Sequence, residues 1–103
     1  MALTRTTDHA EEVTIYQPAA QAFASALAAF QRVGKVQSSQ AKFLRITGKV
    51  RSGHGNMNKA TVTVLVSPVT EDSALVSFKA SAQEGLVQQN TAAKAVSRIL
   101  DSM

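Results

Sequence analysis

Residues 60–66 read Ala-Thr-Val-Thr-Val-Leu-Val, and this stretch decides the fold. The valines at alternate positions would share one side of a strand, and the residues between them, Thr61, Thr63 and Leu65, would share the other. A period of two with β-branched residues is typical of a strand that is buried on one face and open on the other. The stretch therefore predicts an antiparallel sheet with a single apolar face, which other elements must cover.

Four further stretches predict strands on the same alternation: 11–16, 35–40, 43–51 and 74–82. Their inward positions include Val13, Ile46 and Phe78, whereas the residues beside them are mostly polar. The connections at residues 52–58 and 68–73 are rich in turn-forming residues and long enough for hairpins. Together these stretches predict five antiparallel strands.

Two segments predict helices. Residues 18–33 are rich in alanine, the strongest helix former, and carry an apolar stripe at helical spacing: Phe23, Ala26, Leu27, Phe30 and Val33. Gly34 would end this helix in the left-handed conformation. A second helix begins between Leu86 and Thr91, where Asn90 would cap it, and its stripe is Ala92, Val96, Ile99, Leu100 and Met103. Both helices must cover the apolar face of the sheet.

The predicted fold class is α+β, a two-layer sandwich of order β-α-β-β-β-β-α in which a five-stranded antiparallel sheet carries two helices on one face. Residues 1–10 would be a flexible tail, and residues 11–103 a single domain. The order of elements resembles one half of the TATA-binding-protein saddle, and it resembles small uncharacterised bacterial β-α-β-β-β-β-α domains. Because this resemblance rests on element order alone, it implies a fold and carries over no site residue.

The composition excludes several chemistries. The chain has no cysteine, so disulfides, thiolate metal sites and cysteine nucleophiles are ruled out. His9 and His54 have no acidic partner at ligand spacing, and the pairs Glu11–Glu12 and Glu71–Asp72 are expected to be solvated. The loop segment 52–56 lacks the spacing of a phosphate-binding loop. We therefore predict no catalytic, metal or cofactor site, and no enzyme.

No apolar run reaches the length that a membrane-spanning helix requires. The first twelve residues contain acidic side chains and no apolar stretch, which is unlike a signal peptide. These features predict a cytoplasmic protein that does not enter a membrane, unless an export signal has been removed by processing.

The charge distribution singles out the outward face of the sheet. The net charge is +4, and no acidic residue occurs between Val13 and Thr70. Basic side chains at outward positions would contact an anion or a nucleic acid: Arg45, Lys49, Arg51, Lys59 and Lys79. Large apolar side chains on the same face would serve self-association: Tyr16, Phe43, Leu65 and Leu75.

These observations favour a small non-enzymatic binding or assembly module that self-associates through the open sheet face, as a homodimer. The alternative is a nucleic-acid-binding domain that uses the basic face. A solvated face that binds nothing also stays open, because threonine, serine, lysine and arginine are common on such faces. A small-molecule ligand between helices and sheet is disfavoured, since an alanine-rich helix packs closely and leaves little room.

Overall fold

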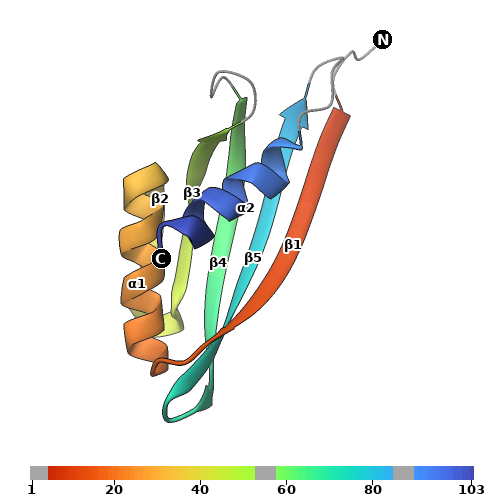
Figure 1. Ribbon diagram of the computed structural model, residues 1–103. Coiled ribbons are helices and arrows are strands. Elements are labelled where there is room, and N and C mark those ends of the chain that lie inside the picture. Colours follow the sequence, from red (N-terminus) through yellow and green to blue (C-terminus); the bar gives the residue numbers. More distant parts are fainter. Residues whose placement is uncertain (1–4, 53–57, 85–89) are drawn as a thin grey trace.

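The computed structural model describes residues 5–52, 58–84 and 90–103 (Figure 1). Its strands are β1 Arg5–Ile15, β2 Gly34–Gln40, β3 Arg45–Ser52, β4 Asn58–Thr70 and β5 Ser73–Glu84. Its helices are α1 Ala19–Val33 and α2 Thr91–Asp101, and a short 3-10 helix, η1 Ala41–Phe43, joins β2 to β3. The predicted order of strands and long helices is confirmed.

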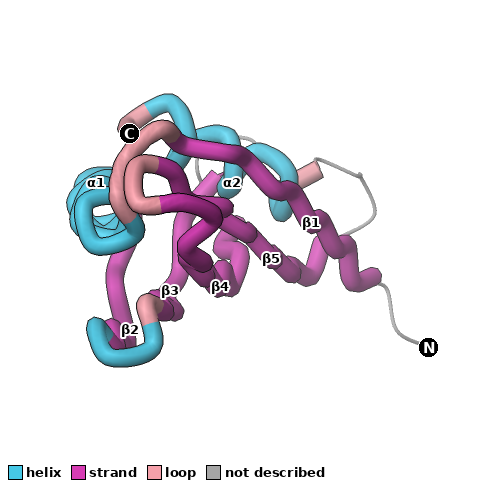
Figure 2. Tube along the Cα trace, turned by 90° about the horizontal axis from the view of Figure 1, so that it is seen from below, coloured by secondary structure: helices cyan, strands magenta, loops and turns pink. Residues whose placement is uncertain are grey.

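The five strands form one antiparallel sheet in the order β1-β5-β4-β3-β2. The edges are therefore β1 and β2, which are separated in sequence only by α1. Both helices lie on the same side of the sheet, with α1 near the β2 edge and α2 running across the central strands (Figures 1 and 2). This arrangement confirms the predicted α+β fold.

The core lies between the helices and the sheet. Ile46, Val64 and Phe78 of three adjacent strands are fully buried, and so are Phe30 of α1 and Ile99 of α2. The inward parity predicted for the central strands is thereby confirmed. Alanines fill much of the contact on the helix side: Ala22, Ala26 and Ala29 of α1 and Ala92 and Ala95 of α2. Their short side chains let the helices approach the strands closely.

Two glycines on adjacent strands show how tightly the helices and strands pack together. A Cβ atom at Gly48 of β3 would lie 2.8 Å from Cε1 of the Phe30 ring and 2.3 Å from the carbonyl oxygen of Lys35. A Cβ atom at Gly34 would lie 2.4 Å from the carbonyl oxygen of Lys49. The prediction that Gly34 is a left-handed helix stop is wrong: its φ is −157°, and it is the first residue of β2. Position 34 requires glycine because a Cβ atom would overlap the backbone of the neighbouring strand.

Three boundaries differ from the prediction. β1 begins at Arg5 and pairs with β5 along its whole length, so residues 5–10 belong to a strand and not to a tail. β3 begins only at Arg45, because Phe43 lies in η1 and Leu44 adopts a left-handed conformation with φ 52°. The hairpin predicted to need a loop at 68–73 turns over Glu71 and Asp72 alone.

We expect Gly48→Ala to lower the free energy of unfolding by about 2 kcal/mol, because the added methyl group overpacks the contact with Phe30. Thr47→Ala is the matched control, since Thr47 is the adjacent residue of β3 and faces away from the helices. Urea unfolding of both variants measures the effect. A Gly48→Ala protein within about 0.5 kcal/mol of the parent would contradict the close packing.

Candidate functional site

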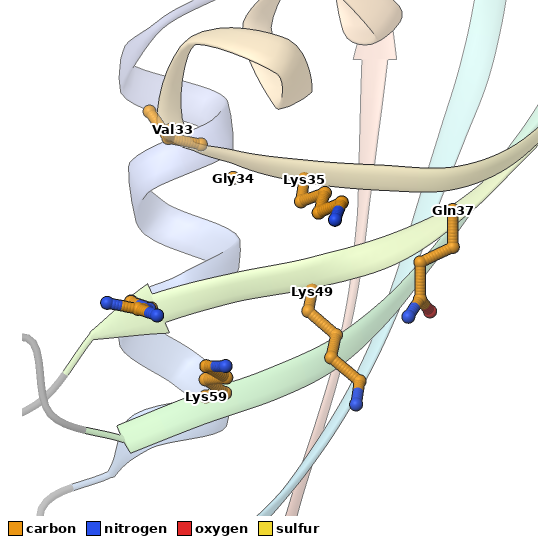
Figure 3. A pocket seen from close by; sticks show the side chains of 7 residues that line it. Val33, Gly34, Lys35, Gln37, Lys49 and Lys59 are labelled. Atoms are coloured by element: carbon orange, nitrogen blue, oxygen red, sulfur yellow. The ribbon is translucent and has the colours of Figure 1, made fainter.

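A cluster of four cations occupies one end of the open sheet face, which we call the basic cluster: Lys35, Lys49, Arg51 and Lys59. Antiparallel register places Lys35 of β2 opposite Lys49 of β3, and Arg51 of β3 opposite Lys59 of β4. The four side chains, with Val33, Gly34 and Gln37, line a depression of about 350 Å³ (Figure 3).

The basic cluster contains three of the five residues predicted to contact an anion, namely Lys49, Arg51 and Lys59. The other two, Arg45 and Lys79, line a separate depression that also includes the acidic Glu12. Lys35 was missed by the sequence analysis. The available signal was its position one residue before Val36, whose side chain is partly buried against the core.

Among the residues that the structure describes, no carboxylate neutralises the basic cluster. None of its four side chains forms an ion pair anywhere in the described part of the chain. Like charges on directly opposed strand positions repel, and cross-strand neighbours lie only about 5 Å apart at Cβ. On the helix side, Arg98 of α2 donates a hydrogen bond from Nη1 to the backbone carbonyl of Arg51. The strand pairing therefore holds an uncompensated positive charge in place.

The apolar residues predicted for self-association are spread over different elements. Tyr16 follows the end of β1, and Phe43 lies in η1, so neither occupies a strand position. Leu65 and Leu75 do face outward from β4 and β5, where the register makes them diagonal neighbours. Tyr16 and Phe43 are 86% and 61% exposed, whereas Leu75 is partly covered.

A second group of polar residues lies on the helix side of β1. Thr7, His9 and Glu11 share this side with the partly buried Val13 and Ile15. The Nε2 atom of His9 is 3.0 Å from Oε1 of Glu11, and the two side chains are 33% and 39% exposed. The pair lies beside Ala80 and Phe78 of β5 in the sheet register. It thus sits at the margin of the helix-covered face, where solvent reaches it.

The statement that His9 has no acidic partner is wrong. It rested on assigning residues 1–10 to a tail, whereas alternate residues of a strand share one face and bring His9 to Glu11. Residues 5–10 carry no apolar alternation that would signal this strand, which forms through its backbone pairing with β5. Glu11 and Glu12 point to opposite faces, and Glu12 Oε2 accepts a hydrogen bond of 3.3 Å from Ser77 Oγ. His54 and residues 53–57 lie outside the described residues.

The interior between helices and sheet is closed. Any side chain that lined an internal cavity large enough for a water molecule would have solvent-accessible area. These large core side chains have none: Phe30, Val62, Val64, Phe78 and Ile99. The depressions at the basic cluster and beside β1 are both outside this core. A ligand of the described part of the chain would therefore bind at an edge of the sheet or on the open face of the sheet.

Within the ranges that the structure describes, no three side chains of histidine, aspartate and glutamate come close enough together to hold a metal ion. In the same ranges, neither long helix combines the length and the apolar composition needed to cross a membrane.

Neither a family model nor a curated protein matches the chain. Among solved structures, the di-domain ARO/CYC BexL from the BE-7585A biosynthetic pathway matches with a TM-score of 0.57 at 12% identity. That match covers 93% of this chain and 42% of BexL, so the chain spans about two-fifths of the di-domain protein. Truncated norcoclaurine synthase from Thalictrum flavum matches with a TM-score of 0.58 at 10% identity, covering 99% of this chain and 93% of that one.

These likenesses show a shared helix-grip fold. The element order behind the resemblance to a TATA-binding-protein half is confirmed, but the two neighbours are an aromatase/cyclase and a synthase. They contradict the prediction of a non-enzymatic binding or assembly module, together with its nucleic-acid-binding alternative. They equally contradict the prediction that the chain is not an enzyme, because this fold is one that enzymes use.

The repulsion between like charges in the basic cluster can be tested by reversing one of them. We expect Lys49→Glu to raise the free energy of unfolding by about 0.5 kcal/mol at low salt, because the new carboxylate would face Lys35 across the β2–β3 ladder. Lys79→Glu is the comparison, since it reverses the same charge opposite Ala10 and Thr63, in a depression that already holds Glu12, and should give no gain. The gain in the free energy of unfolding should become smaller in about 1 M salt, because salt screens interactions between exposed charges. Equal effects of the two reversals on urea unfolding would contradict a local repulsion at Lys49.

Proposed function

We propose that this chain is a small enzyme of the helix-grip fold that transfers a proton to or from a small organic molecule at the His9–Glu11 pair. The observation that carries the proposal is the 3.0 Å separation of His9 Nε2 and Glu11 Oε1, on the helix side of β1 and within reach of solvent. A histidine held by a carboxylate is the usual arrangement for general acid–base catalysis.

The chemistry of the pair assigns each residue a role. An ionised carboxylate only accepts hydrogen bonds, so Nε2–H of His9 donates to Glu11 Oε1. Nδ1 of the neutral ring then carries the lone pair that takes a proton from a substrate. Glu11 is a positioning residue, because it holds the ring and stabilises the imidazolium that forms. His9 is the catalytic residue.

The substrate would lie at the margin of the fold. On the helix side of β5, the residues opposite His9 and Thr7 are Ala80 and Ala82. Both alanines are buried, at 4% exposed each, so a substrate would approach the partly exposed His9 ring from the solvent side of the β1 edge. The two neighbours support the proposal in that the same fold serves enzymes, but their substrates are not carried over.

The test measures base catalysis directly. 5-Nitrobenzisoxazole opens when a base removes its ring proton, and the product is followed by its absorbance. We expect His9→Gln to lower the protein-dependent rate by about tenfold or more, since general base catalysis contributes at least that much. Glu11→Gln should lower the rate less, because the imidazole remains but loses its orienting carboxylate.

The matched control is His54→Gln, which removes the other histidine of the chain and should leave the rate unchanged. Urea unfolding shows whether each variant keeps its fold. A parent rate that His9→Gln does not reduce would overturn the proposal, and so would an equal loss in His54→Gln.

A further inference from the structure

We infer that the basic cluster is a binding site for a phosphate-bearing small molecule. The inference is independent of the proton-transfer proposal, because the two sites lie on opposite faces of the sheet. His9 and Glu11 face the helices on the β1 edge, whereas Lys35 and Lys49 face away from them at the β2 edge.

Charge is the first argument. Lys35 faces Lys49 and Arg51 faces Lys59 in the strand register, and all four side chains are exposed and without an ion pair in the described ranges. Such pairing costs stability in the unbound protein. An anion placed among the four relieves both repulsions at once, so the arrangement favours a ligand with several negative charges over a single carboxylate.

Shape is the second argument. The depression measures about 350 Å³, which is in the range of sites for small molecules. Val33 and Gly34 form one wall. Gln37 lies at a break in the register between Val36 and Ser38, and Figure 3 shows its amide on the same side of the strands as the Lys49 ammonium. The amide would supply a neutral hydrogen bond beside the charges.

The chemistry of the side chains points to phosphate. Lysine ammonium groups bind phosphate as point charges, and an arginine guanidinium donates two parallel hydrogen bonds to its oxygens. The cluster combines three lysines with Arg51. The four cations therefore match the charge and the donor requirements of a diphosphate or of two neighbouring phosphate groups.

The distribution of acids argues for a small ligand and against a long polyanion. Asp8 and Glu12 occupy β1, at the far edge of the same open face. Glu12 shares its depression with Arg45 and Lys79, so those two cations are not free of an opposing charge. A nucleic acid laid across the strands from the basic cluster would meet both carboxylates, whereas a small phosphate ligand would not.

Inorganic pyrophosphate is the probe. Titrated into the full chain at low salt and followed by amide NMR, it should give saturable shifts centred on residues 34–37, 48–51 and 59–61. The double change Lys35→Gln with Lys49→Gln should weaken binding by about tenfold, the equivalent of one charge-assisted hydrogen bond. Both side chains are exposed, so the fold should persist.

The matched control is Arg45→Gln with Lys79→Gln, which removes the same charge from the same face outside the cluster. It should bind pyrophosphate as the parent does. Equal weakening in both double variants would overturn the inference, since it would mean attraction to net charge only. Tighter binding of a single-stranded oligonucleotide at the same phosphate concentration would also overturn it.

His9→Gln separates this inference from the proposed function, because that variant should bind pyrophosphate with unchanged affinity. Loss of proton abstraction with pyrophosphate binding intact would therefore support both assignments. Absence of pyrophosphate binding in the parent would overturn the phosphate site and leave the His9–Glu11 proposal standing on its own assay.

Discussion

The ring of Phe30 lies against the bare backbone of Gly48, and the remaining structure depends on this contact. It brings α1 as close to β3 as a helix can come, because even one methyl group at Gly48 has no room. The buried alanines of both helices extend the same close packing over the central strands. Among the described residues, a core packed in this way gains stability from contact and leaves no hole for a ligand. The His9–Glu11 pair and the basic cluster accordingly lie at the margin of the sheet and on its open face.

The parts of the fold that could be predicted are those in which one local pattern dominates. The alternation around Val62 and Val64 determined which side of the central strands is buried, and the alanine-rich stripe with Phe30 located α1. Both signals come from hydrophobic burial, which repeats along a strand or helix. The alternating pattern also predicted that Arg45, Lys49 and Arg51 face outward, as they do.

The features that escaped prediction depend on partners distant in sequence. Residues 5–10 lack an apolar alternation, and they form a strand because their backbone pairs with β5. The left-handed Leu44 follows from the turn that brings its carbonyl oxygen to the backbone N–H of Val66, 2.9 Å away. Lys35 joined the basic cluster through the β2–β3 register. The prediction that His9 has no acidic partner failed for the same reason, since it assigned residues 1–10 to a tail, whereas β1 includes both His9 and Glu11.

Solvent access distinguishes the closed interior from the His9–Glu11 margin, which is open to small molecules. A soluble nitroxide such as 4-hydroxy-TEMPO tests it, because it accelerates the NMR relaxation of protons that it can approach. We expect strong relaxation of the His9 ring protons and of the Leu65 methyl groups, with little effect on the methyl groups of Ile46, Val64 and Ile99. Relaxation of those three residues as strong as that of Leu65 would show that small molecules reach the interior.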